Sequence, residues 1–249
     1  MKIQHKAGII STALLASLFT ASLVVVQNRI NHSIQPYVES NITRIIETQE
    51  DVLGIQHFGV PKISYKQPHW IKDGFQVSGA YEPEKDQIYL PLGLAITPER
   101  NLSNILAICM TFGSTHNVKE TLDHELGHFY ADKLCESLGK GDWLHFSDGR
   151  EINVNDVGIK LVSEGIAEYF KRTLNGGKDD FEDSDWPRKF EDFFTRKVIY
   201  DGGFHLVKPI IDMYGRRGIE RLMSNPPHTM QDLNYLPMYQ NRVIASLSE

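Results

Sequence analysis

Two histidines and a glutamate stand at a spacing that could bind a metal ion and activate water. Residues 124–128 read His-Glu-Leu-Gly-His. On a helix, residues four apart share one face, so the imidazoles of His124 and His128 can reach a single ion. Glu125 lies about 100° round the helix from His124, beside the ion rather than on it. A glutamate in that position can act as general base toward a metal-bound water.

The residues around this H-E-x-x-H motif favour a helix from about 118 to 138. Asn117, followed three residues later by Glu120, is a candidate N-cap with a capping box, and Gly139 is a candidate stop. Between these ends, apolar residues recur at helical spacing: Val118, Leu122, Leu126, Phe129 and Leu134. We therefore expect both histidines on one amphipathic helix. The alternative is that they are exposed or hydrogen-bonded histidines without an ion.

A catalytic zinc usually has three protein ligands, so a third must be found. The metzincin motif requires Gly and His where this chain has Ala131 and Leu134, which excludes that pattern. A carboxylate on a second predicted helix is the better candidate. Asn155 or Asp156 can cap this helix, and the Asn-Gly-Gly sequence at 175–177 can end it.

The second helix carries two glutamates, Glu164 and Glu168, which share a face because they are four residues apart. We assign Glu164 as the third metal ligand. Glu168 would be an outer partner that accepts a proton from a ligating imidazole and fixes its tautomer. The roles could be reversed, and an exposed acidic pair is the ordinary alternative. Gly165 and Ala167 are small and would let this helix approach the first one closely.

These stretches resemble the gluzincins, the thermolysin-like clan of zinc metallopeptidases with peptidase-MA-like domains. The resemblance rests on the motif at 124–128 and on Glu-Gly-Ile-Ala-Glu at 164–168, and extends to stretches 200–203 and 226–229. It implies that His124, His128 and Glu164 bind Zn²⁺, that Glu125 is the base, and that the substrate is a peptide or protein. The long interval before Glu164 departs from many clan members and predicts an inserted loop around 143–155.

The expected fold is α+β and zincin-like, with a small N-terminal β-sheet, the H-E-x-x-H helix and a mainly helical C-terminal part. A strand is expected within 59–65, and a hairpin from 77–81 and 87–90 around a turn-rich stretch. In the clan an edge strand pairs with the substrate backbone, and 88–91 is our candidate. The helices expected after it lie near 188–200, 206–214, 216–223 and 237–247, with Pro209 kinking or starting one of them.

Peptide hydrolysis also needs a donor that stabilises the oxyanion in addition to the metal. Tyr200, His205 and His228 are candidates from the C-terminal half. Their spacing does not rank them.

The N-terminal segment 7–26 has no charged residue and is long enough to cross a bilayer as a helix. Lys2 and Lys6 precede it, which places the N-terminus in the cytosol and the rest in the periplasm or outside the cell. We expect residues 1–27 to be a single-pass anchor, with a cleaved signal peptide and secretion as the alternative. Residues 28–54 then form a juxtamembrane linker helix that packs on the domain or in a dimer, and 55–249 form the catalytic domain.

Composition agrees with one globular domain that does not bind nucleic acid. The 249 residues are 41% hydrophobic and 23% charged, with a formal net charge of −6 and no basic stripe. Cys109 and Cys135 either form a bridge outside the cytosol or are buried as small apolar residues.

Two functions remain open from the sequence. One is a membrane-anchored zinc metallopeptidase, and the other is a non-catalytic, zinc-stabilised module for peptide binding or assembly. Glu125 favours the enzyme, because a structural zinc site fills its fourth position and has no use for a base.

Overall fold

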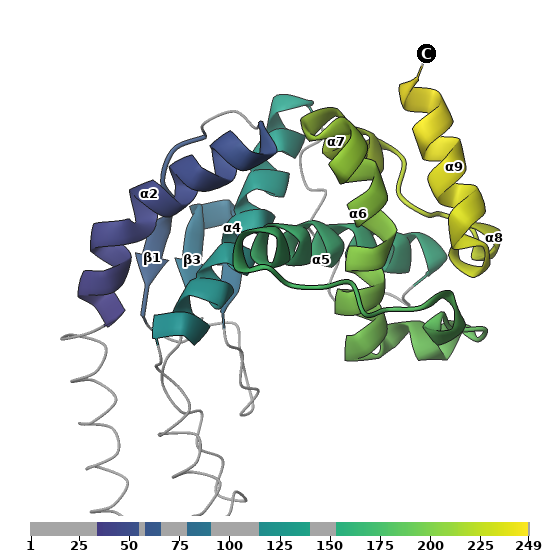
Figure 1. Ribbon diagram of the computed structural model, residues 1–249, viewed down its shortest axis with the longest axis horizontal. Helices are drawn as coiled ribbons and strands as arrows, with labels where there is room; N and C mark the ends of the chain where they lie inside the picture. The colour runs from purple at the N-terminus through teal and green to yellow at the C-terminus, as the bar shows by residue number, and fades with distance from the viewer. Residues whose placement is uncertain (1–33, 55–57, 66–78, 91–114, 140–152, 249) are drawn as a thin grey trace, which may run out of the picture.

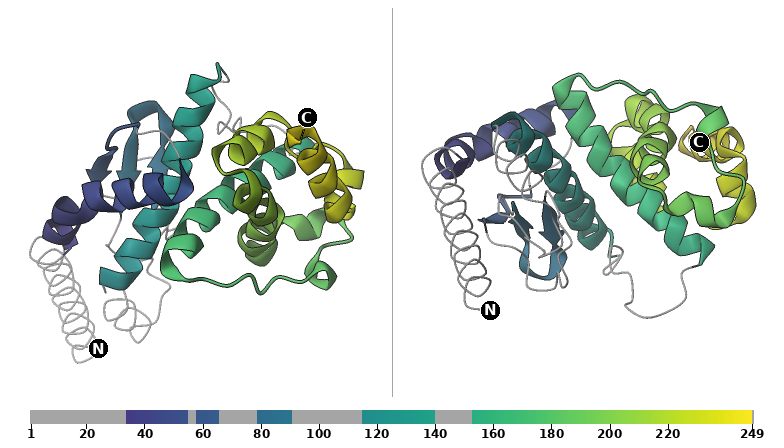
Figure 2. Two further views of the ribbon diagram at one scale, coloured as in Figure 1. Left: turned by 45° about the horizontal axis from the view of Figure 1, so that its top comes forward. Right: turned by 90° about the horizontal axis from the view of Figure 1, so that it is seen from below.

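A computed structural model describes residues 34–54, 58–65, 79–90, 115–139 and 153–248. These residues form an α+β structure that is mostly helical, with one small sheet (Figure 1). Two long helices, α4 (Thr115–Ser137) and α5 (Val154–Asn175), pack on each other in the middle. The sheet and helix α2 (Gln35–Leu53) lie on one side of this pair, and the C-terminal helices lie on the other (Figure 2).

The sheet has three short strands, β1 (Lys62–Ser64), β2 (Ala80–Glu82) and β3 (Gln87–Tyr89). Strands β2 and β3 are antiparallel and are joined by the 3₁₀ turn η2 (Pro83–Lys85), which confirms the predicted hairpin. Strand β1 lies within the predicted range 59–65 and pairs with β3 in parallel. The order is therefore β1-β3-β2.

This order shows that stretch 88–91 is not the edge strand that we expected. Strand β3 has a neighbour on each side, and Ile88 is completely buried. Its backbone groups are thus used within the sheet, and they cannot pair with a substrate. Among the described residues, β2 is the edge strand that packs beside α4.

Helix α2 buries the apolar stripe that was expected within residues 28–54. Its first turn contains Pro36, and it ends at Gly54, whose φ of 61° is left-handed and suits glycine. The buried residues are Ile34, Val38, Ile42, Ile45 and Ile46, and they belong to the same hydrophobic core as α4 and α5. The helix thus packs on the domain.

The ends of α4 and α5 follow local capping rules, although both predicted N-caps are wrong. Helix α4 already includes Thr115, the first described residue of this stretch, so Asn117 lies inside the helix. Helix α5 is capped by Asn153, whose side chain accepts the N–H of Asp156 while Asp156 accepts the N–H of Asn153. The predicted C-terminal stops are confirmed, since Gly139 and Gly176 both have φ of 69°.

The C-terminal half contains four α-helices and shorter turns among the described residues. Its elements are η3 (Asp183–Asp185), η4 (Phe190–Phe194), the π-helical turn η5 (Lys197–Gly202), α6 (Gly203–Tyr214), α7 (Arg216–Ser224), α8 (Met230–Asn234) and α9 (Leu236–Leu247). The helices predicted near 206–214, 216–223 and 237–247 are confirmed. Pro209 lies inside α6 rather than at its start.

The helix predicted at 188–200 is wrong, because this stretch is a 3₁₀ turn followed by the π-helical turn η5. Two features separate these turns. Phe193 is fully buried against Trp186, with ring centroids 5.7 Å apart. Thr195 Oγ1 accepts the N–H of Val198 at 3.4 Å and starts a new helical segment. Tertiary packing thus overrides the helical pattern here.

Three predictions fall wholly or partly on residues that are not described. The apolar segment 7–26 lies outside them, and no helix within the described ranges is long and apolar enough to span a bilayer. Of the inserted loop predicted around 143–155, residues 143–152 also lie outside the described ranges. Cys135 is buried, whereas Cys109 is outside the described ranges, so the bridge stays a prediction.

Candidate metal centre

His124 and His128 from α4 meet Glu164 from α5 at one point. Glu164 Oε2 lies 3.3 Å from His124 Nε2 and 3.4 Å from His128 Nε2. Atoms bound to one tetrahedral zinc at 2.0–2.2 Å lie about 3.3–3.6 Å from one another. The three residues selected from the sequence are therefore close enough to hold a single ion between them.

The two helices reach this distance because they cross at small residues. A Cβ atom on Gly127 would lie 2.6 Å from the Cα of Ala167, so only glycine fits at this crossing. Ala167 thus has the packing role that we expected. Gly165 does not, because it faces the backbone of Gly203 on α6 rather than α4. The small residues of α5 therefore allow close packing on both sides of the helix.

Each imidazole has a second group behind it. His124 Nδ1 lies 3.2 Å from Glu168 Oε1, at ion-pair distance but without hydrogen-bond geometry, and Glu168 is where the outer partner was expected. His128 Nδ1 lies 3.2 Å from the hydroxyl of Ser163, which the sequence reading missed. The only signal in the sequence is that Ser163 directly precedes Glu164. Both contacts leave the Nε2 atoms directed at Glu164, as metal ligation by Nε2 requires.

The charges of the site favour a cation between the ligand atoms. Glu164 Oε2 is buried, and it makes no hydrogen bond to any described residue. Burial lowers the pKa of His124, but the contacts with Glu164 and Glu168 outweigh this effect and raise it to about 9. Burial opposes ionisation of Glu164 too, yet the two histidines bring its pKa well below the usual value. A divalent cation can supply the positive charge that these groups attract.

Glu125 is buried between α4 and the edge strand β2. The backbone N–H of Tyr81 lies near its carboxylate and favours the ionised form. A Cβ on Gly79 would lie 2.7 Å from Glu125 Oε1, so the backbone directly before β2 passes over the carboxylate. Burial raises the pKa of Glu125, against the opposite effect of His124 and His128. Such a pKa suits a general base that takes up a proton and releases it again.

Tyr200 is the one member of the predicted oxyanion-binding candidates that lies at the site. Its ring stacks on His124, with centroids 5.6 Å apart and an interplanar angle of 30°. Burial, followed by the charges of Glu164 and Glu125, raises the pKa of the phenol, so it remains a hydrogen-bond donor.

The other two candidates are engaged away from His124. His205 Nδ1 lies 2.9 Å from Asp179, and Nδ1 of the half-exposed His228 lies 3.3 Å from the carbonyl of Pro226.

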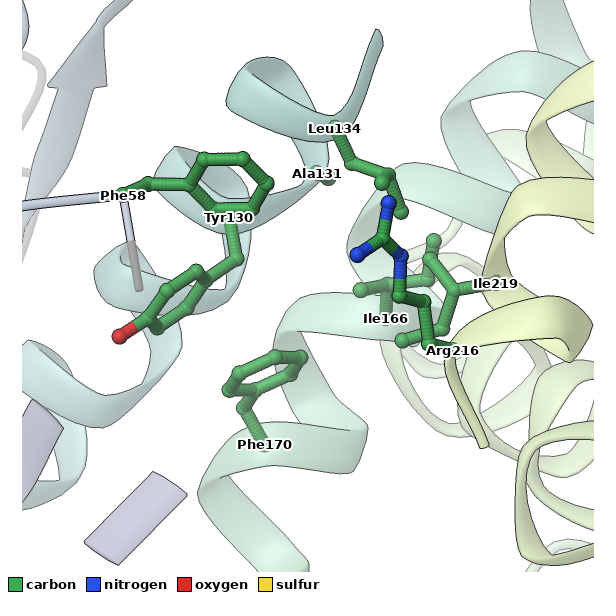
Figure 3. Close-up of a pocket in the computed structure, with 8 residues that line it drawn as sticks. All are labelled: Phe58, Tyr130, Ala131, Leu134, Ile166, Phe170, Arg216 and Ile219. Carbon is green, nitrogen blue, oxygen red and sulfur yellow. The ribbon is translucent and has the colours of Figure 1, made fainter. Parts of the chain in front are cut away.

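A small apolar cavity lies elsewhere between α4, α5 and α7 (Figure 3). It is lined by Phe58, Tyr130, Ala131, Leu134, Ile166, Phe170, Arg216 and Ile219. Its volume of about 10 Å³ is at the lower limit for one water molecule. It is thus an imperfection of packing, too small for a substrate.

A second group of carboxylates, Asp86, Asp132 and Glu136, is also close enough to meet an ion. Here the charges already have partners. Lys133 lies 2.5 Å from Asp86 and 2.9 Å from Glu136, and the Tyr81 hydroxyl donates to Asp132 at 2.8 Å. The His124–His128–Glu164 group is therefore the better metal centre.

Comparisons with protein-family models, with curated proteins and with solved structures gave no match to this chain.

Proposed function

We propose that this protein is a zinc metallopeptidase of the gluzincin type, with a zincin-like catalytic domain. One observation carries the proposal: two imidazoles and a carboxylate converge at ion-binding distances, with a buried glutamate next to them on the same helix. Two nitrogen donors and one oxygen donor suit zinc, and three protein ligands are the usual number in catalytic sites.

In this proposal His124, His128 and Glu164 hold the ion. Bound zinc polarises a carbonyl and lowers the pKa of water. Glu125 takes a proton from the attacking water and delivers it to the leaving amine. The Tyr200 hydroxyl donates a hydrogen bond to the oxyanion that develops on the scissile carbonyl.

The substrate would be an extended peptide that pairs with strand β2. This strand is the edge of the described sheet, and Gly79, directly before it, lies over Glu125. Addition of a strand holds a peptide through its main chain, largely independent of its side chains. We further propose that segment 7–26 targets the domain to the periplasm or cell exterior, as a membrane anchor or as a cleaved signal.

The test is hydrolysis of a peptide library by the full chain, purified in detergent and supplied with zinc. Glu125→Gln should lower kcat by at least about 100-fold, because a general base contributes that much. Zinc content should stay near that of the wild type, because Glu125 is not a ligand. Glu136→Gln, which alters an exposed carboxylate on the same helix, is the control and should cleave normally.

Full activity in Glu125→Gln would remove this residue from the mechanism. A wild-type chain that binds one zinc but cleaves no library peptide would instead favour a non-catalytic, zinc-stabilised binding module.

A further inference from the structure

Arg172, near the end of α5, connects three parts of the structure. Its Nε donates to Glu168 Oε2 at 2.8 Å, and its Nη1 donates to the carbonyl of Lys178 at 3.2 Å. Its Nη2 forms an ion pair with Asp201. The guanidinium also lies 4.7 Å from the centre of the Phe204 ring. These contacts use the planar fork of arginine, which a lysine cannot reproduce.

Both carboxylates that Arg172 binds are connected to His124, one by direct contact and the other through Tyr200. Glu168 uses its other oxygen to approach His124 Nδ1 at 3.2 Å. Asp201 directly follows Tyr200 in the π-helical turn η5, and the Tyr200 ring stacks on the same imidazole. The Arg172 guanidinium thus contacts both Glu168, which lies next to His124 Nδ1, and the turn η5, which places the Tyr200 ring against the His124 imidazole.

We propose that Arg172 is a positioning residue that fixes His124 and Tyr200 relative to each other, through Glu168 and Asp201. This inference rests on the proposed function, because it assigns His124 to the metal and Tyr200 to the oxyanion. Outer partners orient metal-binding imidazoles, and a π-helical turn is an uncommon conformation that needs support from its surroundings. Arg172 supplies the support for both.

Lys171 provides a matched control. Its Nζ lies 3.0 Å from the same carboxylate, Glu168. Its side chain is more exposed, at 31% against 16% for Arg172. Arg172 also forms an ion pair with Asp201. The side chain of Lys171 donates to Glu168, and the backbone carbonyl of Lys171 accepts an N–H of the Asn175 side chain. A general effect of positive charge near Glu168 should therefore appear in Lys171→Gln, which removes a charge, and not in Arg172→Lys, which keeps one. A positioning effect should appear in Arg172→Lys alone.

The experiment compares Arg172→Lys with Lys171→Gln in the full chain. Zinc affinity is measured on metal-stripped protein by chelator competition, and kcat and KM are measured on a cleaved peptide. Arg172→Lys should bind zinc about 10-fold more weakly, the lower end of the range for loss of an outer partner, because Glu168 itself is retained. It should also lower kcat with little change in KM. Lys171→Gln should stay within about fivefold of the wild type, because Lys171 is the partly exposed member of the pair and Arg172 still binds Glu168.

Two further variants separate positioning from general damage. Asp201→Ala removes the acceptor that links Arg172 to η5, so it should lower kcat and leave zinc affinity near that of the wild type. In a Tyr200→Phe background, Arg172→Lys should lower kcat by a smaller factor than in the wild type, because the hydroxyl that it positions is already absent. General damage would give the same factor in both backgrounds.

The inference is overturned if Arg172→Lys and Lys171→Gln have the same zinc affinity and the same kcat. If the wild-type protein binds zinc but cleaves no peptide, the proposed function fails. Zinc affinity of the variants then still tests whether Arg172 positions His124. Wild-type protein without measurable zinc binding overturns both. If Arg172→Lys does not fold, Asp201→Ala decides, and unchanged kcat in that variant counts against the proposal.

Discussion

At the scale of single residues, the two histidines of the motif are held in different ways. Behind His124 stands a carboxylate, that of Glu168, and behind His128 stands the hydroxyl of Ser163. A carboxylate makes the imidazole a stronger electron donor than a neutral hydroxyl does. His124 is also the imidazole on which Tyr200 stacks. We therefore expect His124 to be the more strongly bound ligand, and His128 the one that depends on a single hydrogen bond.

Ser163→Ala tests this dependence. The side chain of Ser163 is buried, so its removal leaves His128 Nδ1 without the hydroxyl partner that it has here. We expect zinc affinity to fall about 10-fold, at the lower end for an outer partner, and stability to fall by about 1 kcal/mol. Chelator competition and urea unfolding measure the two effects. Ser137→Ala, which removes a hydroxyl bonded to a backbone carbonyl at the end of α4, is the control. Equal zinc affinity in the two variants would assign Ser163 to packing only.

At the scale of elements, the metal centre depends on the crossing of α4 and α5. Gly127 stands at the point of closest approach, against the backbone of Ala167. The crossing lies between the two candidate ligands on α4, His124 and His128, and about one turn from Glu164 on α5. Any increase in the helix separation therefore also increases the distance between the ligand atoms.

Gly127→Ala should be destabilising for this reason. In an isolated helix the change would be favourable by up to about 1 kcal/mol, but here the added methyl group meets backbone 2.6 Å away. Overpacking of this kind costs about 1–3 kcal/mol. We thus expect lower stability in urea unfolding, together with weaker zinc binding. A variant that is more stable than the wild type and binds zinc equally would show that the helices are not in contact here.

The elements also show which features can be predicted from sequence. The hairpin and the helix stops at Gly139 and Gly176 follow from local conformational preferences, and they were predicted. The central position of β3 depends on β1, which is distant in the chain and pairs in parallel. The π-helical turn η5 depends on packing of the preceding segment by Phe193. No local pattern contains this information.

The same distinction applies to the site. The spacing of His124, Glu125 and His128 places them on one helix, and this was predicted directly. Glu164 was selected because a second ligand helix had to exist, and the structure brings it to the histidines. Tyr200 could not be separated from the other oxyanion candidates, because its position depends on a turn in the C-terminal half. Ser163 was missed, since one serine on a helix is too common to be informative.

At the scale of the whole molecule, the site lies where the two halves meet. The sheet side places Gly79 and the backbone of Tyr81 near Glu125, and the helical side supplies the ring of Tyr200. Asp123, which is fully buried, ties these parts together directly before the motif. It is bonded to Lys119 at 2.7 Å, to Asn175 on α5 at 2.8 Å and to Gln49 on α2 at 3.2 Å. The motif helix is thereby fixed against both neighbouring helices.

We propose that one zinc ion binds between α4 and α5. Anomalous scattering at the zinc absorption edge, from crystals of the zinc-loaded protein, tests it most directly. We predict one strong peak about 2.0–2.2 Å from Nε2 of His124, Nε2 of His128 and a carboxylate oxygen of Glu164. A peak only at the carboxylates of Asp86, Asp132 and Glu136, or no peak with zinc in excess, would contradict the account.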